Sequence, residues 1–358
     1  MTLRVGIVGC GNISSIYIEN SNRFTDYQVV ACADLDYTKA IEMARKYNVG
    51  KPLELEEIFT SPDIDLILNL TVPHAHSSVS LKAIHNGKHV YTEKPLSISY
   101  NEGKRILDAA REKGVIVGSA PDTFLGGSLQ LAGKWIEEGL IGRIVGATGN
   151  MMSNGPESWH PNPDFYYKAG GGPMFDMGPY YLTALISLLG SVNRVTGIAR
   201  TTYTERLITN PKRFGEFIPV EVPTHVTGIL EMASGVITTI TTSFDVVGAR
   251  TPFLEIYGEK GTLSLPDPNQ FNHPVLVKRD GEIEWTELKT MGDPYDNLRG
   301  IGLADMAKAL QNGYQPRASS EMALHVLEIM EGIHRSSELG THYVMESKCE
   351  KPFLLDAN

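Results

Sequence analysis

The sequence is poor in cysteine, in long hydrophobic runs and in positive charge. Its three cysteines, Cys10, Cys32 and Cys349, show no Cys-x-x-Cys spacing, so we expect small core residues and no metal site. Such sparse cysteine use is typical of a reducing compartment. The apolar run at residues 3–8 is too short for a signal peptide or a membrane span. We therefore expect a cytoplasmic protein with no membrane partner.

Basic residues are outnumbered by acidic ones, 32 against 42, which gives a net charge of −10. Nucleic acids and anionic membranes attract basic surfaces, so neither is expected as the main partner. Hydrophobic residues make up 42% and charged residues 21% of the 358-residue chain, as in ordinary globular proteins. The length suits two domains. Small molecules are the expected ligands.

The first third of the chain alternates short apolar runs with helical patterns, which is typical of βαβ units. Strands are predicted at residues 3–8, 28–33, 66–70, 89–92 and 115–119, and helices at 37–47, 53–59, 77–86 and 100–113. Asp36 or Thr38 could cap the first of these helices. The pattern predicts an α/β domain at residues 1–122, with a doubly wound parallel sheet.

After residue 122 the pattern changes to long β-branched or alternating segments. Strands are predicted at residues 143–152, 192–204, 224–232, 236–246, 253–257, 262–265, 275–279 and 283–288. Turn signals at 233–235 and 280–281 indicate antiparallel hairpins. Helices are predicted at 128–138, 176–189 and 319–339. The second domain, residues 123–358, should be a mostly antiparallel sheet with helices on one face.

A Gly-rich loop follows the first predicted strand and precedes a helix, the context of a dinucleotide fingerprint. Gly9 would allow the tight turn, and Gly11 would let the backbone approach a pyrophosphate at the helix N-terminus. Asn12 and Ile13 follow, and Ser14 stands where the third glycine or alanine is usual. An ordinary strand-to-helix turn is the alternative interpretation.

Asp34 ends the second predicted strand. An acid about 20 residues after the Gly-rich loop typically accepts hydrogen bonds from the adenosine ribose and repels a 2′-phosphate. The next residue is Leu35, with no arginine beside it, so NAD(H) is favoured over NADP(H). Asp34 could instead be an acid at a helix N-terminus, although Asp36 could fill that role equally well.

Two further polar segments lie where buried strands end, and in a parallel sheet these ends face the ligand. The first contains Thr71, Pro73 and His76 and is expected to lie beside the cofactor ribose. The second contains Glu93 and Lys94, and its lysine is the first candidate for catalysis. Burial would lower the pKa of such a lysine, which could then transfer a proton or polarise a carbonyl. A surface ion pair with Glu93 or another carboxylate is the alternative for Lys94.

Five segments in order resemble the Gfo/Idh/MocA family of glucose-fructose oxidoreductase, inositol dehydrogenase and rhizopine-catabolism proteins. They are Gly9-x-Gly11-Asn12, Thr71-x-Pro73-x-x-His76, Glu93-Lys94-Pro95, the run at 139–144, and Gly170-Gly171-Gly172-x-x-x-Asp176-x-Gly178. The late segment at 328–331 also resembles the family's end. The resemblance implies a Rossmann domain, then a domain with a large open-faced sheet through which members form homo-oligomers. It also implies NAD(P)-dependent oxidation or reduction of a sugar, cyclitol or related polyol.

The resemblance places Lys94 near the nicotinamide and the reacting oxygen. Asp176 and Tyr180 lie four residues apart on one helical face, and Tyr180 stands where many relatives have histidine. His160 competes with Tyr180 and Lys94 for proton transfer, or it is only part of the loop scaffold. Trp159 could stack on a sugar or on the nicotinamide, or pack within the loop. Asp122 and Lys168 are weaker candidates for hydroxyl recognition.

The mechanism expected is reversible hydride transfer between a secondary alcohol carbon and nicotinamide, with Asp176 orienting the substrate or tuning the proton-transfer group. Two other functions stay open. One is an NAD-dependent glycosidase that oxidises its substrate transiently, and the other is a catalytically silent NAD-binding sensor. The particular sugar and the direction of reaction cannot be predicted from the sequence.

Overall fold

The structure, a computed structural model, describes residues 2–290 and 292–355. The chain forms two compact units. The first extends to Leu125 and also includes Asn297–Leu327, and the second comprises Gly126–Asp296 and the chain from Glu328 onward. The sequence placed all of 123–358 in the second domain. The return of residues 297–327 to the first unit was not predicted.

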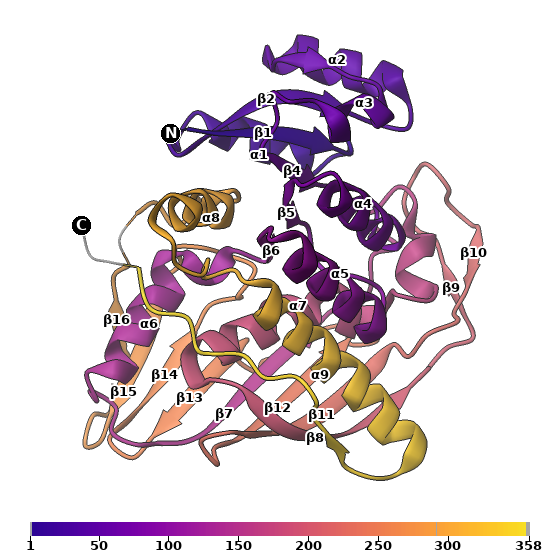
Figure 1. Cartoon of the computed structure of the whole chain (residues 1–358). Coiled ribbons are helices and arrows are strands. Elements are labelled where there is room, and N and C mark those ends of the chain that lie inside the picture. The colour runs from indigo at the N-terminus through magenta and orange to yellow at the C-terminus, as the bar shows by residue number, and fades with distance from the viewer. Residues whose placement is uncertain (1, 291, 356–358) are drawn as a thin grey trace. The chain divides into compact units, whose positions relative to one another are not determined.

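The first unit contains a six-stranded, wholly parallel sheet with the strand order β3-β2-β1-β4-β5-β6 (Figure 1). Its strands are β1 Leu3–Val8, β2 Tyr27–Ala33, β3 Lys51–Pro52, β4 Leu66–Asn69, β5 His89–Thr92 and β6 Val117–Ser119. The prediction of a doubly wound sheet is therefore confirmed. The order reverses between β1 and β4, so the carboxyl ends of these strands form the edge at which such sheets bind ligands.

Helices of the first unit are α1 Ser14–Ser21, α2 Tyr37–Tyr47, α3 Leu55–Thr60, α4 Pro73–His85, α5 Tyr100–Lys113, the short η1 Thr123–Leu125 and α8 Ile301–Asn312. Helix α4 begins four residues before its predicted start, because a proline suits the first turn of a helix. Helix α8 was not predicted. It lies against β2 and β6, where Gly118 leaves room for Met306, and this packing assigns it to the first unit.

The second unit contains a nine-stranded sheet with the order β16-β15-β14-β13-β7-β12-β11-β8-β17 (Figure 1). The strands are β7 Ile144–Met152, β8 Val192–Arg200, β11 His225–Met232, β12 Ile237–Ser243, β13 Leu254–Gly258, β14 Gly261–Leu265, β15 Val275–Arg279, β16 Thr286–Leu288 and β17 Tyr343–Val344. Only β7 and β12 pair in parallel among these described strands. The expected hairpins β11–β12 and β15–β16 are confirmed.

Helices cover one face of this sheet. They are α6 Gly127–Glu137, α7 Gly172–Leu189 and the later part of α9 Ser320–Leu339, and α7 lies against β7, β11 and β12. Along β11 the side chains alternate: Val226 and Leu230 are fully buried, whereas Ile229 is 49% exposed. A short hairpin of β9 Glu205–Leu207 and β10 Phe217–Pro219, together with the 3₁₀ helix η2 Pro163–Tyr167, completes the unit.

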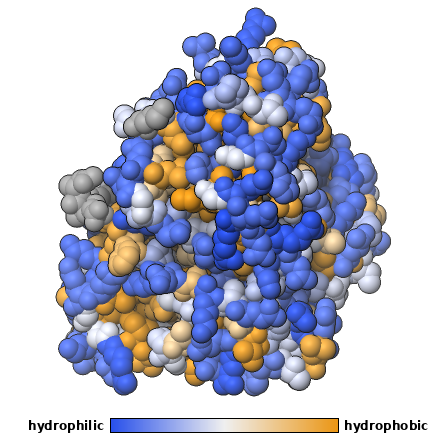
Figure 2. Space-filling model, viewed as in Figure 1, coloured by the Kyte–Doolittle hydropathy of each residue, from blue (hydrophilic) through white to orange (hydrophobic). Residues whose placement is uncertain are grey.

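Hydrophilic residues predominate on the face drawn in Figure 2, where hydrophobic ones form small scattered groups. Within the described residues, none of the helices combines the length and the apolar character that crossing a bilayer requires.

Candidate functional site

The two loop glycines after β1 are required for different reasons. Gly9 has φ of 102°, and a Cβ there would lie 2.7 Å from the carbonyl carbon of Leu70, so the fold itself demands glycine. A Cβ on Gly11 would meet no atom of the described chain within 4 Å. Room at Gly11 is therefore available to something outside the chain, as a bound pyrophosphate would need.

Helix α1 starts at Ser14, directly after Asn12 and Ile13. The buried Ser14 hydroxyl donates to the carbonyl of Gly11 at 2.5 Å. Serine thus takes the third fingerprint position by fixing the loop through its hydroxyl. Backbone N–H groups at a helix start favour an anion.

The carboxylate of Asp34 joins the end of β2 to the Gly-rich loop. It accepts the backbone N–H of Cys10 at 2.8 Å and that of Asp36 at 3.0 Å. Asp36 caps α2 by accepting the Thr38 N–H at 3.1 Å, so Asp34 is not the capping residue. A carboxylate has about four lone-pair sites, which leaves acceptor capacity for ribose hydroxyls.

Asn69, at the end of β4, shapes the segment after it and was missed in the sequence. Its side-chain oxygen accepts the Thr71 hydroxyl at 2.7 Å, and its amide donates to the carbonyl of His76 at 3.0 Å. A polar residue at the end of a buried strand was the available signal. Pro73 occupies the first turn of α4.

His76 lies inside the first unit and is only 1% exposed. Its Nδ1 is 2.6 Å from the carbonyl oxygen of Pro95, and its Nε2 is 2.9 Å from that of Thr71. Burial lowers the pKa of the ring. His76 is thus buried behind the segment that was expected to line the cofactor site, and its ring does not lie on the surface.

Lys94 follows β5, and the carboxylate of Glu93 holds its backbone. Glu93 accepts the Lys94 N–H at 2.9 Å and the Tyr17 hydroxyl at 2.8 Å. Glu93 is 9% exposed, so its carboxylate is not half of an exposed ion pair. The Lys94–Pro95 peptide bond is cis. Tyr17, on α1, was not identified from the sequence because only the fold brings it to Glu93.

The buried carboxylate of Asp122 lies at the N-terminus of α8. It accepts the backbone N–H groups of Gly300 at 2.8 Å and Gly302 at 3.0 Å. Burial raises the pKa of its carboxyl group to about 6. These contacts make Asp122 a helix cap within the first unit.

Helix α7 of the second unit carries Asp176 and Tyr180 one turn apart, as expected. Tyr180 is 7% exposed. Just before the helix, a Cβ on Gly171 would lie 2.5 Å from the carbonyl oxygen of Phe165. The glycine-rich segment therefore lets η2 pack directly against the start of α7.

His160 lies among aromatic rings near η2. Its ring centroid is 5.5 Å from that of Trp159, 5.2 Å from Phe165 and 5.3 Å from Tyr166. The backbone N–H of Asn162 donates to His160 Nδ1 at 3.1 Å, so a neutral ring carries its proton on Nε2. Trp159 remains 63% exposed.

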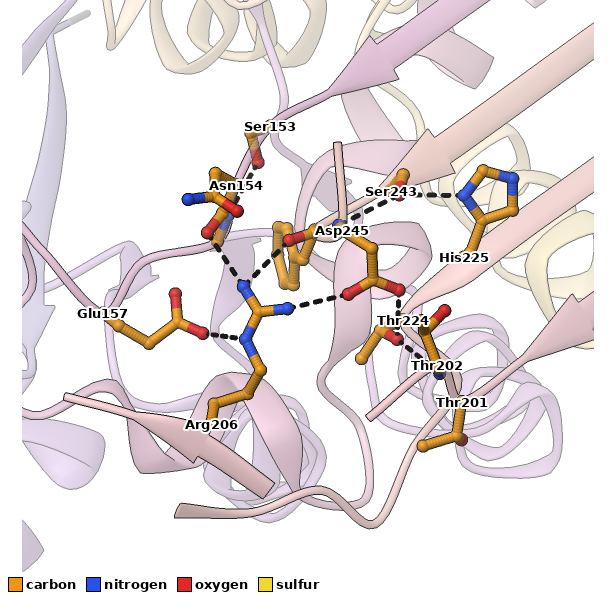
Figure 3. Close-up of polar contacts among 12 residues, drawn as sticks. Ser153, Asn154, Glu157, Thr201, Thr202, Arg206, Thr224, His225, Ser243 and Asp245 are labelled. Atoms are coloured by element: carbon orange, nitrogen blue, oxygen red, sulfur yellow. Dashed lines mark hydrogen bonds and ion pairs between the residues drawn. The ribbon is translucent and has the colours of Figure 1, made fainter. Parts of the chain in front are cut away.

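A buried ion cluster holds the segment that precedes Trp159 (Figure 3). Arg206 pairs with Glu157 and, at 2.8 Å, with Asp245, and it donates to the carbonyl oxygen of Asn154 at 2.9 Å. The Tyr167 hydroxyl donates to Glu157 at 2.5 Å. No local pattern in the sequence predicted this cluster, because its members come from distant segments.

His225 and Lys168 are the remaining polar candidates of this unit. His225 Nδ1 lies 2.9 Å from the Ser243 hydroxyl oxygen, whereas the Lys168 side chain is exposed. Within residues 2–290 and 292–355, no three His, Cys, Asp or Glu side chains form a group that could hold a metal ion.

Comparison with known families gives two matches. Residues 3–120 match a family model described as an oxidoreductase family with an NAD-binding Rossmann fold. Residues 129–264 match the GFO/IDH/MocA C-terminal domain.

Curated relatives resemble the chain at low identity. Trans-1,2-dihydrobenzene-1,2-diol dehydrogenase of Bos taurus is 26% identical, over 92% of this chain and 96% of that protein. Myo-inositol 2-dehydrogenase of Thermotoga maritima is 23% identical, over 89% and 91%. Levoglucosan dehydrogenase of Pseudarthrobacter phenanthrenivorans is 27% identical, but the match covers only 63% of this chain and 61% of that protein.

Solved structures share the fold. An NAD binding oxidoreductase from Klebsiella pneumoniae superposes with a TM-score of 0.84 at 23% identity, covering 97% of this chain and 100% of that one. A levoglucosan dehydrogenase complex with NADH gives 0.82 at 21% identity, with the same coverage.

Proposed function

Because the chain belongs to the GFO/IDH/MocA oxidoreductase family, we propose that it transfers a hydride between NAD(H) and a sugar, cyclitol or related polyol. The reacting carbon would be a secondary alcohol or its carbonyl. The relatives named as dehydrogenases of myo-inositol, levoglucosan and trans-1,2-dihydrobenzene-1,2-diol support this substrate class.

The clear space at Gly11 is the observation that carries the cofactor assignment. A Cβ would fit there without meeting the described chain, which leaves the room that close approach of a pyrophosphate needs. Asp34 and Thr71 follow β2 and β4 at the same edge of the parallel sheet as this loop. These residues, with Asn12 and Ile13, would hold the dinucleotide.

NAD(H) is proposed over NADP(H) because of Asp34. Its oxygens accept two backbone N–H groups, which fix the carboxylate at the end of β2. A fixed negative charge there would accept ribose hydroxyls and repel a 2′-phosphate. When bound, the nicotinamide accepts or supplies the hydride.

Lys94 is proposed to contact the reacting oxygen and to stabilise the negative charge that develops on it. Tyr180 is proposed to exchange the proton, and Asp176, one turn earlier on α7, to orient the substrate. His160 is proposed to bind the substrate rather than to exchange its proton. When its ring is neutral, its Nε2 carries a proton, so it can donate a hydrogen bond to a substrate oxygen. Trp159 would offer its exposed ring to an apolar face of the sugar.

Self-association through the open face of the nine-stranded sheet is part of the proposal. Ile198, Ile229 and Ile237 share that face by strand register, and they are 75%, 49% and 59% exposed. Exposed apolar residues grouped in this way favour an interface between copies. Replacing Ile229 with lysine should lower the mass measured by light scattering.

A cytoplasmic location is proposed from the composition.

The test is to follow the absorbance of NADH across a panel of cyclitols, aldoses, ketosugars and glycosides, with NADP(H) in parallel. NADH formed in proportion to oxidised substrate supports the dehydrogenase. Release of an aglycone without NADH accumulation would identify a glycosidase. No turnover on any panel member, with NADH still bound, would identify a sensor.

A further inference from the structure

Buried side chains hold the backbone around Lys94 from both sides. Before the lysine, Glu93 accepts its N–H at 2.9 Å and is itself fixed by the Tyr17 hydroxyl at 2.8 Å. After it, the carbonyl oxygen of Pro95 lies 2.6 Å from Nδ1 of His76. The lysine side chain therefore starts from a short backbone segment that is fixed at both ends.

The other ring nitrogen of His76 lies against the segment that follows β4. Its Nε2 lies 2.9 Å from the carbonyl oxygen of Thr71. Helix α4 supplies the imidazole, β4 leads into Thr71, and β5 leads into Pro95. One buried ring thus spans the carboxyl ends of two adjacent strands of the parallel sheet.

Both partners of His76 are carbonyl oxygens, which only accept hydrogen bonds, so a ring nitrogen must carry a proton to bond either. Burial lowers the pKa of the ring, and a neutral ring carries one proton. The contact with Pro95 is the shorter of the two, so we place that proton on Nδ1. An apolar side chain of similar size would fill the space but leave the Pro95 carbonyl unpaired in the interior.

We propose, on the basis of the function proposed above, that His76 is a positioning residue for Lys94. It holds the Pro95 carbonyl so that the lysine reaches the reacting oxygen from a fixed backbone. Its position, 1% exposed, excludes direct contact with a substrate. His76 therefore acts on turnover through the backbone of its neighbours.

Three variants test the proposal. His76→Leu fills the volume without a donor, and His76→Gln keeps N–H donors on a side chain of similar reach. Ile84→Val is the matched control for stability, because Ile84 is fully buried on the same helix α4. Steady-state kinetics, NADH titration and thermal unfolding are measured for each.

The expected result is a fall in kcat of about tenfold or more for His76→Leu, as for other small displacements of a catalytic group. KM for the substrate and the Kd for NADH should change less than about threefold, as expected when only a transition-state contact is weakened. His76→Gln should recover most of the lost kcat, and Ile84→Val should keep wild-type kcat. A His76→Leu enzyme with kcat within twofold of wild type overturns the proposal, as does a glutamine variant no better than leucine.

Hydrogen exchange supplies a measurement that needs no turnover. A peptide covering residues 93–100 should exchange at least about tenfold faster in His76→Leu than in wild type, while one covering 28–33 in β2 should not change. Equal rates at 93–100 overturn the proposal even if the wild type proves inactive on every substrate. If His76→Leu does not fold, the same comparison is made with His76→Gln, whose exchange at 93–100 should stay close to wild type; faster exchange there overturns the proposal.

Discussion

Asp34 and Cys10 are joined by a hydrogen bond of 2.8 Å between the aspartate carboxylate and the backbone N–H of the cysteine. The residue that would select the cofactor therefore also fixes the loop that would bind its phosphates. Cofactor choice and loop geometry would then depend on one side chain.

Replacing Asp34 with asparagine should shift the cofactor preference. The amide removes the charge that repels a 2′-phosphate, so the ratio of kcat/KM for NAD over NADP should fall by about tenfold or more. Asp36→Asn removes the same charge two residues away and keeps a good helix cap, so its ratio should stay at the wild-type value. Equal ratios in all three proteins would remove Asp34 from this role.

The loop glycines should respond differently to alanine. Gly11→Ala should fold normally, because its Cβ meets no described atom within 4 Å, but it should bind NADH more weakly by about tenfold. Gly9→Ala should lower the free energy of unfolding by more than about 1 kcal/mol, because φ is positive and the Leu70 carbonyl is close. NADH fluorescence titration and urea unfolding measure the two effects. Unchanged NADH affinity in Gly11→Ala would contradict the cofactor assignment.

Tyr180 and His160 should differ in which kinetic constant they control. Tyr180→Phe removes the proposed proton-exchanging group and should lower kcat by about 10²-fold or more. His160→Phe removes a donor and should mainly raise KM for the substrate. A large loss of kcat in His160→Phe, with near-normal kcat in Tyr180→Phe, would reverse the two roles.

Asp122 should make stability depend on pH. Burial raises its pKa from 3.8 to about 6, so between these values the folded state binds more protons than the unfolded state. Its contribution to stability is full below about pH 3.8 and falls as the pH rises to about 6, by at most about 3 kcal/mol in total. In Asp122→Asn this fall should be absent, so the variant should gain more stability than wild type between pH 4 and 6. Parallel urea-unfolding profiles would show that Asp122 does not titrate in this range.

The sequence predicted helices accurately where capping residues mark their ends. Residues 37–47 and 100–113 were predicted as helices and are α2 and α5. Asp36 and Ser99 cap their starts, and Asn48 and Gly114 end them in the left-handed conformation. Caps and end residues are read directly from the sequence, so these boundaries were accurate.

The sequence did not predict which residues far apart in the chain contact one another. Helix α8 carries an ordinary amphipathic pattern, and nothing in that pattern says that it packs against β2 and β6. The Tyr17–Glu93 and Arg206–Glu157 contacts join residues 76 and 49 positions apart. Motifs could place Lys94 at a strand end, but only the fold identifies the side chains that hold its backbone.

Transfer of a labelled hydride tests the central claim most directly. A substrate that turns over in the panel is prepared with deuterium on its reacting carbon and incubated with NAD and either wild type or Lys94→Ala. The wild type should form NADH with one deuterium at C4 of the nicotinamide for each substrate oxidised. Lys94→Ala should bind NADH but form almost none of this product. Unlabelled NADH from the wild type, or near-normal labelled product from Lys94→Ala, would contradict hydride transfer assisted by Lys94.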